Sequence, residues 1–267
     1  LWRHRELVVA SVRRELRARL SGTQLGRLWP LVAPLLLFAV YWFVFTELLG
    51  FKLPGLAPEH APAMGVYMFL GVVVWTAFAE GLARSTHAMV DNANLIGRVA
   101  FPAELLPVQL VLAQLFTMLL ALGACLVVAT AAGLWRPPGP WLAAAPLLLL
   151  LQALFTVGLG LFTATVHVFV RDTAHVVAVL TTLWMFATPV FWVPSPEVLP
   201  GIERWLGLVE ANPLHHLLYA WRAALMGGEP ALAFGASVAR SVAVFAAWAL
   251  AVFACGHTVF VLGSRRF

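Results

Sequence analysis

The chain has 267 residues, of which 62% are hydrophobic and 11% are charged, and its formal net charge is +5. A chain this apolar cannot bury its apolar surface in one soluble core, which excludes an ordinary water-soluble domain. The positive charge invites a nucleic-acid interpretation, but the arginines flank long apolar stretches, where they are typical of membrane topology signals, so we expect no nucleic-acid partner.

Six stretches of the sequence contain no Asp, Glu, Lys or Arg and are long enough to cross a bilayer, which takes roughly 20 apolar residues. They are 28–46, 60–79, 105–135, 137–170, 173–196 and 241–264. A charge at the bilayer centre costs about 2.5–3.5 kcal/mol on insertion scales, so this pattern predicts an all-α membrane protein with six transmembrane helices. We expect a single transmembrane domain over 1–267, with spans at 28–48, 62–84, 105–134, 141–169, 174–193 and 238–262.

The first segment, 1–24, is predicted to be an amphipathic helix in the membrane interface. Apolar residues fall on one side at helical spacing, namely Val8, Val9, Val12, Leu16 and Leu20. Arginines fall on the other side, namely Arg3, Arg13, Arg14 and Arg17. The helix either shapes the cytoplasmic entrance of a transport path or only anchors the first span.

Arginine distribution predicts the orientation of the chain. With the N-terminus in the cytoplasm, twelve of the 17 basic residues fall on cytoplasmic segments and five on the other side. This matches the positive-inside rule, and an even number of spans then places both termini in the cytoplasm.

The cytoplasmic connection before the third span is predicted to hold a short helix over 90–104. Asp91 or Asn92 can cap this helix, and Leu95, Ile96 and Val99 would share one face of it. An exposed apolar face on a cytoplasmic loop favours a protein partner, although these side chains could also pack against the helices of the bundle.

The segment 197–228 is predicted to form two short helices on the outer side that are too short to span. Asn212 supplies an N-cap and Pro213 the first helical position, and Gly227-Gly228 ends the second helix. The two helices either re-enter the outer leaflet or lie on it, and re-entrant backbone needs protein or water to satisfy its hydrogen bonds.

Motifs for catalysis and metal binding are absent from the sequence. The single lysine, Lys52, is followed by leucine, so no phosphate-binding P-loop exists, and neither HExxH nor GxSxG occurs. The neighbours His215 and His216 face different directions on a helix, so we expect no metal site there. The charge-free windows hold no carboxylate or amine for a proton relay, so energy for transport must come from a partner protein.

Several motifs together resemble the permease subunits of ABC-2 type exporters, most closely the branch that exports O-antigen, capsule or teichoic acid chains. The motifs are His4-Arg5-Glu6-Leu7, Leu25-Gly26-Arg27-Leu28-Trp29, the run from Asn94 to Pro107 with Phe101-Pro102-Ala103-Glu104-Leu105-Leu106-Pro107, Arg171-Asp172, Thr188-Pro189-Val190, and Asn212-Pro213 with Tyr219 and Arg222. The resemblance covers nearly the whole chain.

The resemblance implies a transport subunit in the bacterial cytoplasmic (inner) membrane, not an enzyme, that works as a homodimer with two copies of a nucleotide-binding ATPase. ATP and Mg²⁺ would bind that partner, and this chain would hold no cofactor. The implied substrate is a glycan on a polyprenyl diphosphate. Docking of the ATPase falls on Asp91, Asn94, Leu95, Ile96, Arg98, Val99 and Phe101.

The resemblance also places the substrate path at the homodimer seam, lined by the first and fifth spans. Both carry aromatic residues, which stack on sugar surfaces without requiring one sugar sequence: Phe38, Tyr41, Trp42 and Phe45 in the first, and Trp184, Phe186, Phe191 and Trp192 in the fifth. An aromatic belt or helix packing is the alternative.

The diphosphate needs cations at the cytoplasmic rim, for which the candidates are Arg13, Arg14, Arg17 and Arg27 beside the Leu25-Gly26 turn. Anionic lipid head groups are the alternative partners of these arginines. Two other functions remain open, an ABC-2 permease for a small hydrophobic drug or lipid, and a membrane-embedded enzyme or structural protein.

Overall fold

The structure is a computed structural model that describes residues 5–20, 28–50, 63–93, 102–133, 140–196, 198–226 and 237–264. In chain order its helices are α1 (Arg5–Leu20), α2 (Trp29–Trp42), the π-helix η3 (Phe43–Leu48), α3 (Ala63–Asp91), α5 (Leu105–Ala131), the 3₁₀-helix η5 (Pro140–Ala144), α6 (Ala145–Phe169), α7 (Thr173–Ala187), the 3₁₀-helix η6 (Ile202–Arg204), α8 (Leu206–Ala211), α9 (Pro213–Leu225) and α10 (Val238–Ser264). No strand occurs among these residues, which confirms the all-α prediction for the described part of the chain.

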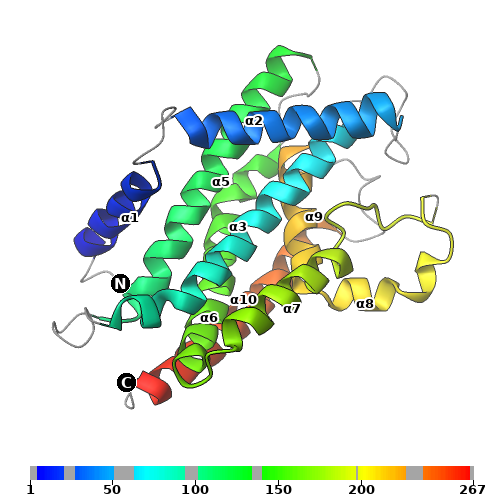
Figure 1. Cartoon of the computed structure of the whole chain (residues 1–267). Helices are drawn as coiled ribbons and strands as arrows, with labels where there is room; N and C mark the ends of the chain where they lie inside the picture. Colours follow the sequence, from blue (N-terminus) through cyan, green and yellow to red (C-terminus); the bar gives the residue numbers. More distant parts are fainter. Residues whose placement is uncertain are drawn as a thin grey trace.

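Four long helices, α3, α5, α6 and α10, run lengthwise through the molecule and are long and apolar enough to cross a membrane (Figure 1). They coincide with four of the six predicted spans. The end of α3, the turn between α6 and α7, and the end of α10 lie together at one end of the molecule. This is the end that the arginine distribution predicts to be cytoplasmic.

The predicted first and fifth spans form shorter apolar helices, at Val32–Leu48 and Thr173–Ala187. The 14 residues of α2 give an α-helix of about 21 Å, short of the ~30 Å hydrocarbon core, before the π-helical turns begin. Helix α7 ends at Ala187 because Pro189 disfavours helical backbone in Thr188. The six-span count therefore stays a prediction for these two segments.

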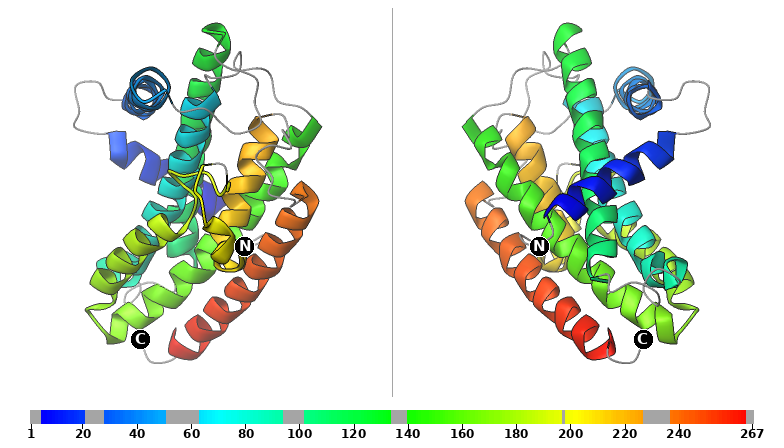
Figure 2. Two further views of the ribbon diagram at one scale, coloured as in Figure 1. Left: turned by 90° about the vertical axis from the view of Figure 1, so that its right-hand side faces the viewer. Right: turned by 90° about the vertical axis from the view of Figure 1, so that its left-hand side faces the viewer.

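Helix α2 lies across α3 and α5, and Figure 2 shows it nearly end-on while the long helices run up the view. This direction differs from that expected of a spanning helix beside the others. A glycine permits the close crossing, because a Cβ at Gly65 would lie 2.8 Å from the Cα of Trp42.

Helix α3 is longer than the predicted span 62–84 and continues through Asp91. The side chain of Asn92 donates a hydrogen bond from Nδ2 to the carbonyl of Ala88 at 2.9 Å, one turn back. Asp91 is the last residue of α3, Asn92 forms a turn and Ala93 is helical again, so the helix predicted over 90–104 stays a prediction. The rest of that helix up to residue 101 lies outside the described residues.

The core lies between the four long helices and α9. Its largest fully buried side chains include Phe69, Phe78, Phe155, Phe245 and Trp221. Twelve of the 13 residues of α9 are buried, and the helix contacts α3, α6 and α10. The second short outer helix is thus an interior element of the fold.

Candidate functional site

The N-terminus of α9 is joined to the C-terminal end of α7 by one asparagine. The Oδ1 atom of Asn212 accepts hydrogen bonds from the backbone N–H of Leu214 at 3.1 Å and from the indole of Trp184 at 2.9 Å. Its Nδ2 atom donates to the hydroxyl of Thr188 at 2.8 Å and to the carbonyl of Ala187 at 3.4 Å. The predicted N-cap is confirmed, and the same side chain fixes α7 against α9.

The C-terminal half of α9 carries a buried arginine that binds backbone. Only 3% of Arg222 is exposed. Its guanidinium donates to the carbonyls of Tyr67 at 3.2 Å, Pro189 at 2.7 Å and Val190 at 2.9 Å. The guanidinium carbon lies 3.5 Å from the centre of the Tyr67 ring, a cation–π contact. A Cβ at Gly71 would collide with this guanidinium, so the site requires glycine there.

A third polar contact anchors the opposite side of α9. The indole of Trp221 donates to Oε1 of Gln152 on α6 at 3.0 Å. The Nε2 atom of Gln152 donates in turn to the carbonyl of Val74 on α3 at 3.3 Å. Since every buried polar group in this chain of contacts has a partner, α9 is held rigidly in the bundle.

Three of the eight predicted path aromatics meet beside Arg222. The Tyr41 and Phe45 rings stack with centroids 5.9 Å apart, and the Tyr41 and Phe191 centroids are 6.4 Å apart. They pack against a buried apolar cluster that includes Tyr67 and Tyr219. The fold therefore joins the aromatic sets of the first and fifth predicted spans.

The other path aromatics of α2 have packing contacts. Phe38 is buried and meets Phe69 edge to face at 5.3 Å. The backbone and indole of Trp42 lie against Gly65. These two side chains fit helix packing, the alternative that the sequence left open.

The remaining path aromatics, near the end of α7, differ in exposure. Trp184 faces inward and makes edge-to-face contacts with Phe78 at 5.6 Å and Phe155 at 6.3 Å. Phe186 is 65% exposed. The indole of Trp192 donates to the carbonyl of Phe186 at 3.1 Å. Only Phe186 and the half-buried Trp192 are open to a ligand from this side.

Residues 6–226 match the family described as ABC-2 type transporter. The chain belongs to this family. It is 32% identical over 254 residues to the O-antigen export system permease protein RfbA of Myxococcus xanthus, which covers 93% of this chain and 91% of that relative. It is 25% identical over 223 residues to a protein of the same name from Klebsiella pneumoniae, over 84% of this chain and 81% of that relative. ABC-2 permeases are membrane transport subunits that normally work with a separate ATPase subunit.

The permease carries its N-terminal helix against α5. Arg13, Arg14 and Arg17 are exposed on α1, and their contact with a head group or lipid stays a prediction. An ion pair that the sequence did not reveal joins Glu15 of α1 to Arg84 of α3, with Nη1 and Oε1 2.6 Å apart. The other proposed rim residues, Leu25, Gly26 and Arg27, lie outside the described residues.

The apolar side of α1 is only partly buried against the rest of the permease. Val12 and Leu16 are half-buried, whereas Val9 is 57% exposed. The exposed end of this side fits an interface helix that keeps apolar surface for lipid.

Of the predicted docking residues of the permease, only Asp91 is described, and it is exposed at the end of α3. The others lie outside the described residues, namely Asn94, Leu95, Ile96, Arg98, Val99 and Phe101. The docking surface therefore stays a prediction.

The neighbouring histidines at the start of α9 contact each other edge to face, with ring centroids 5.2 Å apart. Ring nitrogens of His216 lie 3.3 Å from the hydroxyl of Ser241 and 2.8 Å from the carbonyl of Glu210. Burial lowers the pKa of His215 to about 3 and also lowers the pKa of His216. Within the described ranges, no three His, Cys, Asp or Glu side chains group as metal ligands would.

Proposed function

We propose that this chain is the permease subunit of an ATP-driven exporter that moves a lipid-linked polysaccharide, such as O-antigen, capsule or a teichoic-acid-like chain, across the cytoplasmic membrane. The observation that carries the proposal is the similarity, over most of both chains, to proteins named O-antigen export system permease. Two copies of the permease work with two copies of an ATPase that holds ATP and Mg²⁺.

The ATPase docks on the cytoplasmic connection between α3 and α5. Asp91 marks the start of this connection at the predicted cytoplasmic end of the bundle. Helix α3 extends beyond the predicted span, so it would reach out of the membrane and present the connection to the partner. Burial of Leu95, Ile96 and Val99 at such a contact contributes about 1.5–3 kcal/mol each.

The substrate path runs at the homodimer seam. Support comes from the aromatic cluster of Tyr41, Phe45 and Phe191, because it brings together the two aromatic segments that the path was predicted to use. Further support comes from α7, none of whose residues is buried in the single chain. The substrate's diphosphate first meets the exposed arginines of α1.

Helix α9 serves as a re-entrant element that supports the outer part of this path. A non-spanning helix is tolerated at membrane depth only where protein satisfies its polar groups. The hydrogen bonds of Asn212, Trp221 and Arg222 meet this condition. Because Arg222 holds the segment before Phe191, α9 also fixes the position of the aromatic cluster.

Transport in reconstituted vesicles tests the proposal. Vesicles with the permease and its ATPase are loaded with lipid-linked polysaccharide, and export and ATP hydrolysis are measured together. We expect that Tyr41→Ala combined with Phe191→Ala slows export while basal ATP hydrolysis survives, because the aromatic contacts act on the polymer. The matched control is Phe162→Ala, an exposed aromatic on α6 away from the cluster. Unchanged export by the double variant would make these residues packing groups, and transport of only a small hydrophobic compound would favour the drug or lipid alternative.

A further inference from the structure

A groove of about 470 Å³ lies between α1, α2, α3 and α5, away from the contacts of α9. Its volume falls in the range of roughly 300–1,000 Å³ typical of small-molecule sites. The groove brings together side chains that are distant in the sequence, including Trp29, Glu80 and Gln114. None of these three is among the residues that the family resemblance selects for the path, the rim or ATPase docking.

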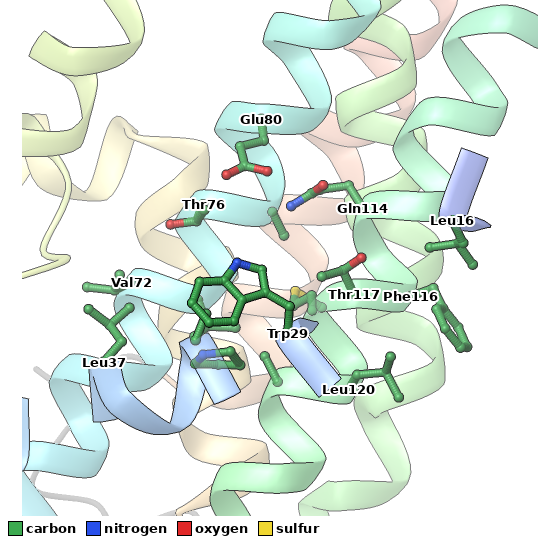
Figure 3. Close-up of a pocket in the computed structure, with 16 residues that line it drawn as sticks. Leu16, Trp29, Leu37, Val72, Thr76, Glu80, Gln114, Phe116, Thr117 and Leu120 are labelled. Carbon is green, nitrogen blue, oxygen red and sulfur yellow. The ribbon is translucent and has the colours of Figure 1, made fainter. Parts of the chain in front are cut away.

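The lining of the groove changes from polar to apolar along its length. Figure 3 shows Glu80, Thr76 and Gln114 on one side of the Trp29 indole, and Leu37 and Leu120 on the other. An amphiphile matches such a lining, because it has a polar head joined to an apolar chain. The apolar end is bounded by α2 and α5, whose exposed side chains continue into the lipid-facing surface.

Glu80 is the charged group among the residues that line the groove. Its carboxylate has no hydrogen bond or ion pair within the described part of the chain, and its side chain is exposed. Arg84, one turn further along α3, is already paired with Glu15. Because an α-helix rises 1.5 Å per residue, Glu80 lies about 6 Å from Arg84 toward the middle of α3. A carboxylate at that depth is costly unless a cation approaches it.

We propose that this groove binds a membrane lipid whose head group is a primary ammonium, the chemistry of phosphatidylethanolamine. The ammonium donates hydrogen bonds to Glu80, and one acyl chain lies along Leu37 and Leu120. Glu80 repels an anionic head group, which separates this site from one for a polyprenyl diphosphate. A choline head group keeps the positive charge but has no N–H donor, so it binds less well. This inference does not depend on the nature of the exported substrate.

Lipid binding to the purified full chain tests the site. Native mass spectrometry in detergent measures the affinity for phosphatidylethanolamine, phosphatidylcholine and phosphatidylglycerol. We expect phosphatidylethanolamine to bind roughly tenfold more tightly than phosphatidylglycerol, as one charge-assisted hydrogen-bonded contact allows. Glu80→Gln should remove this preference, whereas the control Glu47→Gln, an exposed glutamate on η3, should keep it. Equal affinity of the unmodified chain for phosphatidylethanolamine and phosphatidylglycerol, or an unchanged preference in Glu80→Gln, would overturn the proposal.

A second variant and a position readout separate loss of the site from loss of the fold. Ala33→Phe adds bulk to the groove from the exposed side of α2 and leaves Glu80 intact, so it should weaken phosphatidylethanolamine binding about as much as Glu80→Gln. In the unmodified chain, phosphatidylethanolamine with a photoreactive acyl chain should label α2 and α5. Labelling confined to α10, or full affinity in Ala33→Phe, would contradict the assignment to this groove.

Discussion

Arg222 places a positive charge inside the protein, and no carboxylate among the described residues forms an ion pair with it. Three backbone carbonyls and the face of Tyr67 take that role. Guanidinium suits this task because its planar fork donates several hydrogen bonds in fixed directions. The residue therefore fastens α9 to α3 and to the segment after α7, and Gly71 leaves the room that it needs.

Substitution of Arg222 tests this role. Arg222→Ala leaves buried carbonyls without donors, and each such loss costs about 1–3 kcal/mol, so we expect a large fall in apparent melting temperature in detergent. The melting temperature of Arg222→Lys should lie between those of the unmodified chain and Arg222→Ala, because an ammonium cannot reach all three carbonyls in the same geometry. The control is Arg240→Ala, whose pairing with Glu210 at 3.5 Å is exposed and should contribute little. Equal melting temperatures for Arg222→Ala and Arg240→Ala would show that Arg222 does not stabilise the fold.

Among the helices, α6 and α10 form the most extensive pair. Two glycines let their backbones touch. A Cβ at Gly256 would collide with the carbonyl oxygen of Gly158, and one at Gly158 would lie 2.6 Å from the Cα of Phe253. In lipid, helices have little hydrophobic reason to associate, so close packing through small residues supplies much of the attraction.

Enlarging one of these glycines should therefore open the α6–α10 crossing. Gly256→Ala pushes backbone against backbone, which no rotamer change can relieve, and we expect it to destabilise the chain by about 1–3 kcal/mol. Thermal denaturation in detergent measures the effect. Gly207→Ala on α8 is the matched control, because a Cβ there meets nothing within 4 Å. If Gly256→Ala and Gly207→Ala have the same melting temperature, the close crossing is not needed for stability.

At the scale of the whole molecule, α7 is an apolar helix with no buried residue in the single chain. Helix α7 exposes a row of aliphatic residues at helical spacing, namely Val176, Val179, Leu180 and Leu183. Lipid can cover such a row in a membrane, as it covers the outer faces of other helices. Because α7 leads into the segment that carries Phe191 of the aromatic cluster, we propose that the contact between two permeases lies here.

Cysteine cross-linking tests this contact in membranes. We expect Leu183→Cys to form a disulfide-linked dimer, because an isologous interface brings the same residue of two copies close together. Leu250→Cys on α10 is the control, since Leu250 is similarly exposed but lies on a helix outside the proposed contact. Both variants carry Cys255→Ala to remove the exposed native thiol. If Leu250→Cys forms the linked dimer and Leu183→Cys does not, the contact between two copies lies at α10 and not at α7.

Local patterns sufficed for several features of the fold. The apolar windows predicted the four long helices because the cost of a charge in the membrane acts on each segment independently. The Asn212-Pro213 pair predicted the start of α9, because an N-cap is also a local feature, a contact between near neighbours in the chain. The end of α3 was placed too early, at residue 84, because the apolar window marks only the membrane segment and not the helix that continues through Asp91.

The sequence by itself determined that this is an all-α membrane protein of the ABC-2 type with a capped α9, since these properties follow from composition, spacing and motifs. Tertiary structure alone decided which residues meet. It buried α9, joined Tyr41 to Phe191, paired Glu15 with Arg84 and placed Glu80 in a groove. The physical reason is that these contacts join residues from different helices, whose meeting depends on how the helices cross and not on any spacing along the chain.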